Sequence, residues 1–365
     1  MNYYIIAGEA SGDLHASNLM KELKVLDNNT HFRCWGGDLM RAQGAELVKH
    51  YHELAFMGFT EVLMNLRTIF KNIDFCKKDI LQHRPDVLIL VDYPGFNIRI
   101  AEFAKAQGIK VFYYISPQIW AWKQSRVHKI KKVVDKMFVI LPFEKEFYQR
   151  FNFDVDFVGH PLLDAVQNYS LQTSTLSVTT DKPIIALLPG SRKQEISTML
   201  PLMLLMKKQY VNYQFVIAGA PSQNKEFYQT FIGDDDIKIV FNETYQLLQK
   251  SEAALVTSGT ATLETALFGV PEVVCYKGGA ISYSIAKQLV KVKYISLVNL
   301  IMDKEIVKEL IQNELTETNL KIELDKLLKP ETRTKILADY AELKVKLGGS
   351  GASKKAAELM VGYLK

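Results

Sequence analysis

Short apolar runs recur along the chain, and each is followed by polar turn residues and then by a segment with helical periodicity. The runs are YYIIAG, DVLILVDYPG, KVFYYISP, KMFVILP, PIIALLPGS, YQFVIAGA, AALVTSG and PEVVCY. Continuous apolar strands that alternate with segments of helical period are typical of parallel sheets covered by helices on both faces. The pattern therefore predicts an α/β fold.

The strand–helix pattern is interrupted over residues 158–183, where Ser, Thr and Asp are frequent and a linker is expected. A second series of strands begins at Ile184 and ends near Tyr276. The 365 residues suffice for two domains. We expect an N-terminal domain over 1–175, a C-terminal domain over 176–347, and a Gly-rich joint with a terminal helix over 348–365. This helix folds back on its own chain or is exchanged in a homodimer, since the joint permits either.

Composition narrows the class of protein. The formal net charge of +5 fits phosphorylated ligands or an anionic membrane surface and is too small to indicate nucleic acid. The three cysteines are far apart, which indicates neither a disulfide framework nor a zinc site and fits the cytoplasm. The apolar run after Met1 is too short for a signal peptide, and no run reaches the roughly 18 residues of a spanning helix. We expect any membrane contact to be peripheral.

The first strand-to-helix turn, AGEASGDLH, is rich in small and polar residues: Gly8, Glu9, Ser11, Gly12, Asp13 and His15. The glycines permit close backbone approach, and the free N–H groups at the helix start favour an anionic ligand. A well-capped turn is the simpler interpretation, although a helix needs only one cap. The spacing is not G-x-G-x-x-G, so a dinucleotide site is not favoured.

A second candidate is Asp92, which directly follows the apolar run LILV. Partial burial at a strand end would raise the pKa of this carboxyl toward a value useful to a general base. The alternative is an aspartate that caps the next helix. Pro94 and Gly95 indicate a constrained loop, which favours the catalytic interpretation.

Two strand ends in the second half predict a pocket for a nucleoside diphosphate. In LLPGSRKQEI, Gly190 and Ser191 precede a helix start, and the guanidinium of Arg192 suits a diphosphate. The alternative is a surface arginine after an ordinary turn. In VTSGTATLE a second helix start is followed one turn later by a carboxylate that can accept both ribose hydroxyls. The residues concerned are Ser258, Gly259, Thr260 and Glu264.

Weaker features allow two interpretations each. Trp120, Trp122 and the basic residues after them form an aromatic, basic rim or a solvated helix face. The apolar stripe over 56–70, which includes Phe59, Leu66 and Phe70, is a buried helix or a surface that enters lipid. The acidic run at 233–236 is expected to be solvated rather than a metal site. His160 reaches the domain cleft or is structural.

Eight motifs together resemble the lipid-A-disaccharide synthase family, from about residue 3 to residue 310. They are AGEASGDLH, MGFTEVL, YYISPQIWAWKQSR, LPFEKEFY, VGHPLLD, LLPGSRKQEI, SGTATLE and KYISLVNLI, in this order. The resemblance implies a GT-B fold with two Rossmann-like domains that face each other across a cleft. It also implies an enzyme of lipid A (lipopolysaccharide) biosynthesis that acts peripherally at the inner face of the cytoplasmic membrane.

The reaction implied by the resemblance is an inverting glycosyl transfer that requires no metal or cofactor. It joins UDP-2,3-diacylglucosamine to 2,3-diacylglucosamine 1-phosphate (lipid X) and yields the β-1,6-linked disaccharide 1-phosphate and UDP. Asp92 matches the family's essential acid, Arg192 its essential arginine, and Asn299 a further active-site position. The GSR and SGTATLE segments match the UDP site, which leaves the opening loop from Gly8 to His15 to bind the acceptor.

One departure concerns Gly95, where family members often have an acid, so this loop lacks the second carboxylate that a two-carboxylate mechanism would need. Other GT-B enzymes that use UDP-sugars, such as a peptidoglycan N-acetylglucosaminyltransferase or a UDP-sugar epimerase, would share the UDP pocket. A non-catalytic carrier of lipids or nucleotide-sugars is a further alternative. The opening loop argues against another GT-B enzyme. The presence of Asp92, Arg192 and Asn299 argues against a non-catalytic carrier.

Overall fold

The computed structural model describes residues 1–54, 66–170, 175–233, 236–279 and 292–365. The chain forms two compact units. The first comprises Met1–Asp164 and Leu347–Lys365, and the second comprises Ala165–Lys346. Within the described ranges, no helix has both the length and the apolar character needed to cross a membrane.

The first unit is built on a seven-stranded parallel sheet with the order β3-β2-β1-β4-β5-β6-β7. The central strand pair places Ala7 opposite Val91, and both strands are buried on both faces. The strands are β1 (Asn2–Ala7), β2 (His31–Gly36), β3 (Glu46–His50), β4 (Val87–Val91), β5 (Lys110–Tyr114), β6 (Lys136–Val139) and β7 (Asp156–Phe157).

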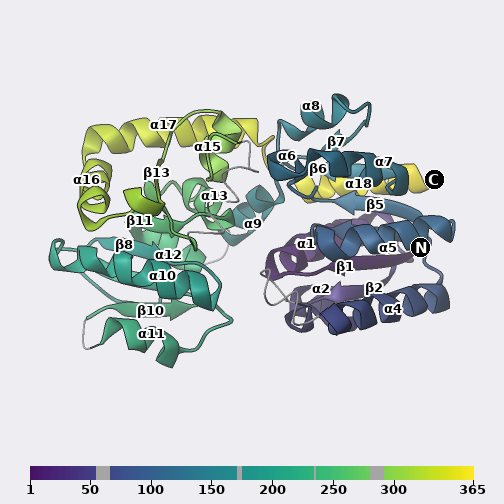
Figure 1. Ribbon diagram of the computed structural model, residues 1–365, viewed down its shortest axis with the longest axis horizontal. Coiled ribbons are helices and arrows are strands. Elements are labelled where there is room, and N and C mark those ends of the chain that lie inside the picture. Colours follow the sequence, from purple (N-terminus) through teal and green to yellow (C-terminus); the bar gives the residue numbers. More distant parts are fainter. Residues whose placement is uncertain (55–65, 171–174, 234–235, 280–291) are drawn as a thin grey trace. The chain divides into compact units, whose positions relative to one another are not determined.

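Helices of the first unit form two groups, one for each face expected of a parallel sheet. Helix α1 contacts α2 and α18, whereas α5 contacts α4 and α7 (Figure 1). The helices are α1 (Ala10–Leu26), α2 (Asp38–Ala42), α4 (Leu66–His83), α5 (Pro94–Ala106), α6 (Ile119–Trp122), α7 (Val127–Val133), α8 (Glu144–Gln149) and α18 (Ala352–Leu364), with the 3₁₀ turns η1 (Tyr51–Glu53) and η2 (Gln124–Arg126).

The C-terminal helix α18, yellow in Figure 1, lies among the elements of the first unit and folds back on its own chain. Its buried side chains include Ala356, Ala357 and Met360. The carboxylate of Asp164 accepts hydrogen bonds from the backbone N–H groups of Gly351 (2.6 Å) and Ser353 (2.8 Å) and so satisfies the start of this helix.

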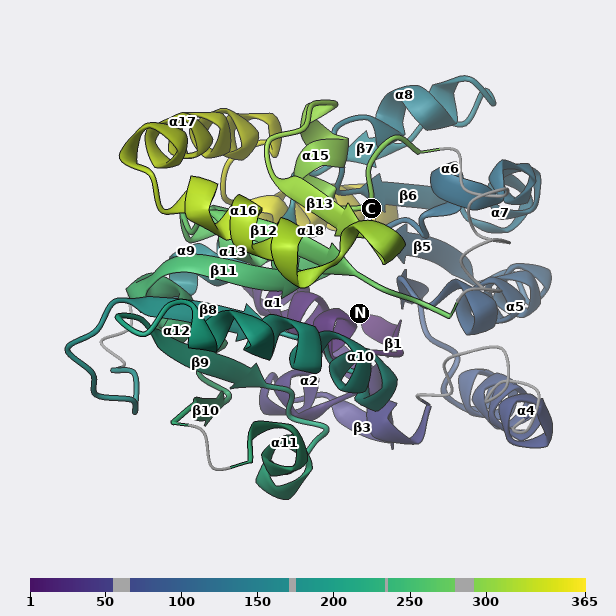
Figure 2. The same cartoon turned by 60° about the vertical axis from the view of Figure 1, so that its left-hand side comes forward.

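The second unit contains a six-stranded parallel sheet with the order β10-β9-β8-β11-β12-β13 (Figure 2). Its strands are β8 (Ile184–Leu188), β9 (Gln214–Gly219), β10 (Lys238–Phe241), β11 (Ser251–Thr257), β12 (Glu272–Tyr276) and β13 (Lys308–Ile311). Its helices are α10 (Lys193–Leu204), α11 (Lys225–Ile232), α12 (Thr244–Lys250), α13 (Thr260–Leu267), α15 (Leu297–Met302), α16 (Glu317–Leu327) and α17 (Pro330–Lys346), with the 3₁₀ turns η3 (Leu205–Lys208) and η4 (Gln312–Glu314).

The prediction of a linker over 158–183 is wrong for its first part. Residues Pro161–Ser170 form helix α9. Leu162 and Ala165 are buried apolar residues about one turn apart, which gives this segment a face that packs even though polar residues surround it.

Candidate active site

The first group of candidate residues lies where β1 and β4 end side by side. Because Ala7 pairs with Val91, the next residues of both strands leave the sheet together and bring Gly8 and Glu9 next to Asp92 and Tyr93. Burial, together with the negative charge of Glu9, raises the pKa of the Asp92 carboxyl from 3.8 to about 7. The expected strand-end acid is therefore present, with a pKa suited to proton transfer near neutral pH.

The expectation of a constrained loop at Pro94 and Gly95 is wrong, because helix α5 begins at Pro94, whose fixed φ suits the first helical position. The backbone just before this helix, at Asp92 and Tyr93, is held in a rare conformation. Both residues have positive φ angles, 45° and 48°, which cost a non-glycine residue of the order of 1–3 kcal/mol each. The Asp92 carbonyl accepts hydrogen bonds from the Tyr113 hydroxyl (2.6 Å) and the Asn97 amide (2.7 Å). These two bonds stabilise the turn that carries the acid, and neither Asn97 nor Tyr113 had been expected as a site residue from the sequence.

Gly8 is required by the side chain of Tyr93. A Cβ atom at residue 8 would lie 2.4 Å from Tyr93 Cγ, far closer than atoms can approach. At Gly12 a Cβ atom would lie 3.2 Å from the Cβ of Ala7, so this glycine lets α1 run close to β1. Gly8 therefore leaves room for Tyr93 in the turn at Asp92, and Gly12 leaves room for Ala7 between α1 and β1.

Asp13 and His15 point into the unit rather than toward solvent. The buried Asp13 carboxylate accepts N–H groups of Gly37 (2.8 Å), Leu39 (3.1 Å) and Met40 (3.1 Å) and anchors the start of α2. His15 is buried, and burial lowers its pKa to about 4. Ser11 is exposed and Glu9 is half-buried. The structure thus leaves Glu9 and Ser11 as the polar side chains of this loop that are open to solvent.

His160 lies close enough to His15 to feel its charge. Burial, with a smaller contribution from His15, lowers the pKa of His160 to about 3. His160 Nδ1 accepts a hydrogen bond from the Leu162 N–H (3.2 Å), and the backbone N–H of His160 donates to the Leu347 carbonyl (3.2 Å). These contacts are those of a structural histidine.

In the second unit, β8 and β11 are neighbours with Leu188 opposite Val256, so the GSR and SGT segments follow adjacent strand ends. Gly190 adopts a positive φ of 108°. Both oxygens of the Glu195 carboxylate are engaged at the start of α10. One accepts the N–H groups of Ser191 and Arg192 (3.3 Å each), and the other pairs with Arg192 Nη1 at 2.9 Å. The sequence analysis had not singled out Glu195.

Glu264 lies one turn into α13, and its carboxylate accepts the Tyr245 hydroxyl at 3.0 Å. Burial raises the pKa of this carboxyl. The Tyr245 ring contacts Phe268 (4.9 Å) and Tyr169 (5.2 Å), so aromatic side chains surround the acid. The remaining residues are Ser258, whose hydroxyl donates to the Ile295 carbonyl (3.0 Å), and the exposed Gly259 and Thr260.

Asn299 is fully buried in the second unit. Its amide nitrogen donates to the Val307 carbonyl (2.8 Å) and to Glu309 Oε1 (2.9 Å), and its amide oxygen accepts the N–H groups of Ile306 (2.8 Å) and Val307 (3.1 Å). Four hydrogen bonds occupy the whole amide. The side chain therefore fixes the connection between α15 and β13.

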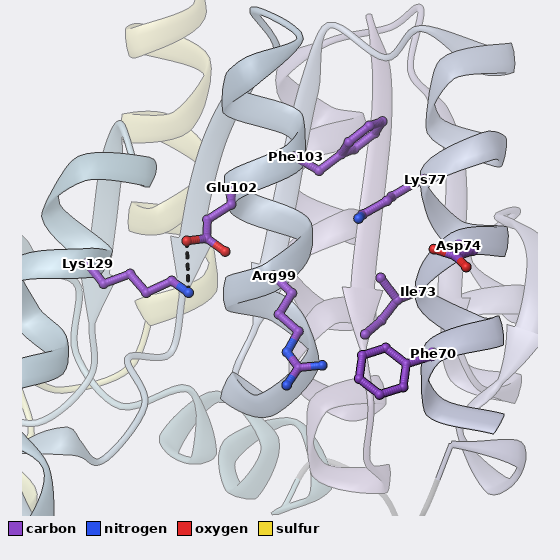
Figure 3. A pocket seen from close by; sticks show the side chains of 8 residues that line it. All are labelled: Phe70, Ile73, Asp74, Lys77, Arg99, Glu102, Phe103 and Lys129. Atoms are coloured by element: carbon purple, nitrogen blue, oxygen red, sulfur yellow. Dashed lines mark ion pairs between the residues drawn. The ribbon is translucent and has the colours of Figure 1, made fainter. Parts of the chain in front are cut away.

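A groove of about 500 Å³ lies on the first unit between α4, α5 and α7 (Figure 3). Figure 3 shows Arg99 beside the exposed ring of Phe70, at 5.3 Å, and Lys129 paired with Glu102 at 2.8 Å. Lys77 lies 5.5 Å from the Phe103 ring. The other lining residues are Ile73 and Asp74. The groove thus combines basic groups with apolar and aromatic walls.

Three other features of the sequence are the segment at Trp120, the apolar stripe and the acidic run. Trp120 is buried with its ring centroid 4.9 Å from that of Phe143, so this residue forms neither an aromatic rim nor part of a solvated helix face. The tryptophan packs inward because apolar neighbours surround it. Residues 55–65 of the apolar stripe and 234–235 of the acidic run lie outside the described residues.

Comparisons with known proteins identify the family of this chain. A family model described as lipid-A-disaccharide synthetase matches residues 3–361. The lipid-A-disaccharide synthases of Geobacter metallireducens and Syntrophus aciditrophicus are 38% and 39% identical to the chain. The alignments cover 99% of this chain in both cases, and 96% and 97% of those proteins.

Solved structures resemble the whole chain at low sequence identity. The UDP-GlcNAc 2-epimerase of Neisseria meningitidis bound to UDP-GlcNAc has a TM-score of 0.69 at 13% identity, covering 99% of this chain and 100% of that one. The calicheamicin glycosyltransferase CalG4 has a TM-score of 0.63 at 14% identity, covering 99% and 98%. These likenesses show a fold of the GT-B type. The family match and the relatives, each spanning nearly the whole chain, show that this chain belongs to the lipid-A-disaccharide synthase family.

Proposed function

We propose that the protein is an inverting glycosyltransferase that joins UDP-2,3-diacylglucosamine to lipid X and releases the β-1,6-linked disaccharide 1-phosphate and UDP. The observation that carries the proposal is the family match over residues 3–361. The raised pKa of Asp92 at the end of β4 supports the chemistry that such a reaction requires.

Asp92 acts as the general base in this proposal. Its carboxylate takes the proton from the primary hydroxyl of the acceptor as the oxygen attacks the anomeric carbon of the donor. The bond from that carbon to UDP breaks on the opposite face, so the configuration inverts, and the reacting centre develops oxocarbenium character. A base with a pKa of about 7 is partly ionised at neutral pH and basic enough to accept the proton.

The opening loop holds the acceptor. Glu9 accepts hydrogen bonds from acceptor hydroxyls, and Ser11 donates to a hydroxyl or to the acceptor phosphate. Gly8 and Gly12 let this loop pack against Tyr93 and Ala7. Asp13 and His15, which point inward, support this loop by fixing α1 to its neighbours.

The second unit binds UDP. Arg192 and the N–H groups at the start of α10 stabilise the charge that the diphosphate gains as it leaves, so the proposal requires no metal. The start of α13, at Gly259 and Thr260, adds further donors, and Glu264 accepts ribose hydroxyls. Ser258 supports this turn through its bonds to the carbonyls of Ile295 and Cys275. Asn299 is a positioning residue, because its amide is fully used in holding the α15–β13 connection.

Both substrates carry acyl chains, and the protein meets them at an anionic membrane surface. The α4–α5–α7 groove supports this proposal because Lys77 and Arg99 lie beside aromatic rings, one of which, Phe70, is 52% exposed. Basic groups attract anionic lipid headgroups, and an exposed aromatic ring enters the headgroup region.

The decisive experiment is an assay of UDP release with both lipid substrates. We expect UDP and disaccharide in equal amounts, and no UDP release without the acceptor. Binding of the UDP-sugar without turnover would indicate a carrier, and a UDP-sugar altered only at its own stereocentre would indicate an epimerase. Arg192→Ala should lose both rate and UDP affinity, whereas Lys335→Ala, an exposed cation on α17, should lose neither.

A further inference from the structure

An internal carboxylate occupies the donors at the start of α10. Glu195 Oε2 accepts the N–H groups of Ser191 and Arg192, and Oε1 pairs with the Arg192 guanidinium. These donors belong to the segment that the proposed function assigns to the UDP diphosphate. A helix start of this kind binds an anion, and the anion present here is the protein's own side chain.

The loop is shaped to let this carboxylate approach. A Cβ atom at Gly190 would lie 2.8 Å from Glu195 Oε2, and the φ of this residue, 108°, disfavours any side chain. The Ser222 hydroxyl donates to the Ser191 carbonyl at 2.9 Å and holds the loop from its other side. Residue 190 therefore carries no side chain that would keep the Glu195 carboxylate away from the two N–H groups.

The contact between Arg192 and Glu195 is open to solvent, so another anion can replace the carboxylate. The side chains of Arg192 and Glu195 are 55% and 35% exposed. The two backbone bonds, at 3.3 Å, exceed the usual range of about 2.7–3.2 Å for N–H···O bonds. A phosphate oxygen offers a stronger charge-assisted acceptor to the same donors, and the carboxylate has solvent into which it can turn.

The two anions cannot use these donors at once. Each N–H group points to one acceptor, and a carboxylate next to a diphosphate would add a repulsion between like charges. We propose that Glu195 is a built-in competitor of the diphosphate: it holds the phosphate donors in the empty enzyme, leaves them when the UDP-sugar binds, and returns to displace UDP after transfer. This inference rests on the proposed UDP site and adds a positioning residue that controls occupancy of that site.

A purely structural role makes the opposite prediction. Glu195 lies three residues after Arg192, the N-cap residue of α10, and a glutamate at this position stabilises a helix start. In a structural role it would hold Arg192 in place for the ligand. Its removal would then weaken UDP binding. The sign of the change in UDP affinity therefore separates the two roles.

The test compares Glu195→Gln with the wild type by calorimetry, using UDP, inorganic pyrophosphate and uridine as separate ligands. We expect the variant to bind UDP roughly fivefold to tenfold more tightly, with a similar gain for pyrophosphate and none for uridine, because only the diphosphate competes with Glu195. Glu331→Gln removes an equal charge from the first turn of α17 and should leave all three affinities unchanged.

Unchanged or weaker binding of UDP and pyrophosphate to a folded Glu195→Gln protein would overturn the inference. Thermal melting establishes that the variant is folded, and Glu195→Ala gives a second test with the side chain shortened. If wild-type protein binds UDP and Arg192→Ala does not, the proposed site stands whatever Glu195 does. If the wild type binds no UDP, it is the proposed function that fails.

Discussion

Asp92 combines three features that are individually costly. The carboxyl is half-buried beside Glu9, its backbone has a positive φ, and the next residue shares that conformation. Such features destabilise a fold, and they gather where strain and burial serve chemistry. The environment of Asp92, and not only the family match, therefore supports its role as the general base.

Replacing Asp92 with asparagine should abolish turnover and stabilise the protein. At pH 8 the wild type holds a buried negative charge that the amide lacks. The full shift from 3.8 to about 7 corresponds to ~4 kcal/mol, and because water reaches this site we expect a gain of ~1–2 kcal/mol in the free energy of unfolding. Denaturant unfolding and the UDP-release assay measure the two effects, and UDP affinity should stay near the wild-type value. A variant that keeps a tenth of the wild-type rate would exclude Asp92 as the base.

The activity should depend on pH through the same carboxyl. A general base works when it is deprotonated, so kcat/KM should fall about tenfold per pH unit below pH 7 and level off above it. Stability changes in the other sense: between about pH 4 and pH 7 the folded state binds a proton that the unfolded chain has lost, so stability falls as pH rises. A flat rate profile from pH 5.5 to 8 would contradict the assignment.

At the scale of elements, the turn after β1 depends on the turn after β4. The ring of Tyr93 occupies the space that any side chain at residue 8 would need. Tyr93 also donates its hydroxyl to the Leu54 carbonyl at 3.1 Å, which limits how far the ring can move. The two strand ends therefore form one packed structure around the acid.

Gly8→Ala should displace Tyr93 and with it Asp92. We expect a loss of about 1–3 kcal/mol in the free energy of unfolding from overpacking, with activity reduced at least about a hundredfold. Gly95→Ala is the matched control, since no atom lies within 4 Å of the added methyl group. It replaces glycine in helix α5 and should stabilise the protein by about 0.4–1 kcal/mol with near wild-type activity. Equal losses in both variants would refute the argument from packing.

The α4–α5–α7 groove gives a prediction for the membrane surface. Lys77→Glu combined with Arg99→Glu should weaken binding to vesicles containing anionic phosphatidylglycerol at least about tenfold, because each basic group near such a surface contributes about 1 kcal/mol. Calorimetric UDP affinity should be unchanged. The control is Lys145→Glu with Arg150→Glu in the same unit, where Lys145 is exposed on α8 and Arg150 is exposed directly after it. Equal loss in both pairs would assign the effect to net charge rather than to the groove.

At the scale of the whole molecule, the chain returns to its first unit at the end. Helix α18 packs against α1, and Asp164 satisfies its start. Residues separated by more than 180 positions thus complete one core. The stability of the first unit depends on the last segment of the sequence.

Met360→Ala should destabilise the first unit by about 2–4 kcal/mol, since this side chain is fully buried. Calorimetric unfolding should show a lower transition for the first unit, while UDP binding in the second unit persists below that transition. Glu358→Ala, exposed on the same helix, should change neither. Loss of UDP binding together with the first transition would show that the units do not unfold separately.

The sequence alone determined the central strands, because β1, β4, β5, β8 and β11 lie deep within parallel sheets and must be apolar along their whole length. It also placed Asp92 and Arg192 at strand ends, since the strand pattern fixes where each run leaves the core. It gave no comparable signal for β2, β3, β7, β10 and β13. Four of these are edge strands or short, and β2 contains Arg33, whose charge is paired with Asp79 at 2.6 Å.

Only the tertiary structure decided which polar groups are used inside the fold. Asp13 and Glu195 are both acids near a helix start, yet one is buried against α2, 24 residues away, and the other lies over the donors of its own helix. The Asn299 amide is hydrogen-bonded to residues of the following loop, and α18 packs against α1 near the N-terminus. Hydrophobic periodicity is a local property and can be read along the chain, whereas hydrogen-bond partners are set by segments that folding brings together.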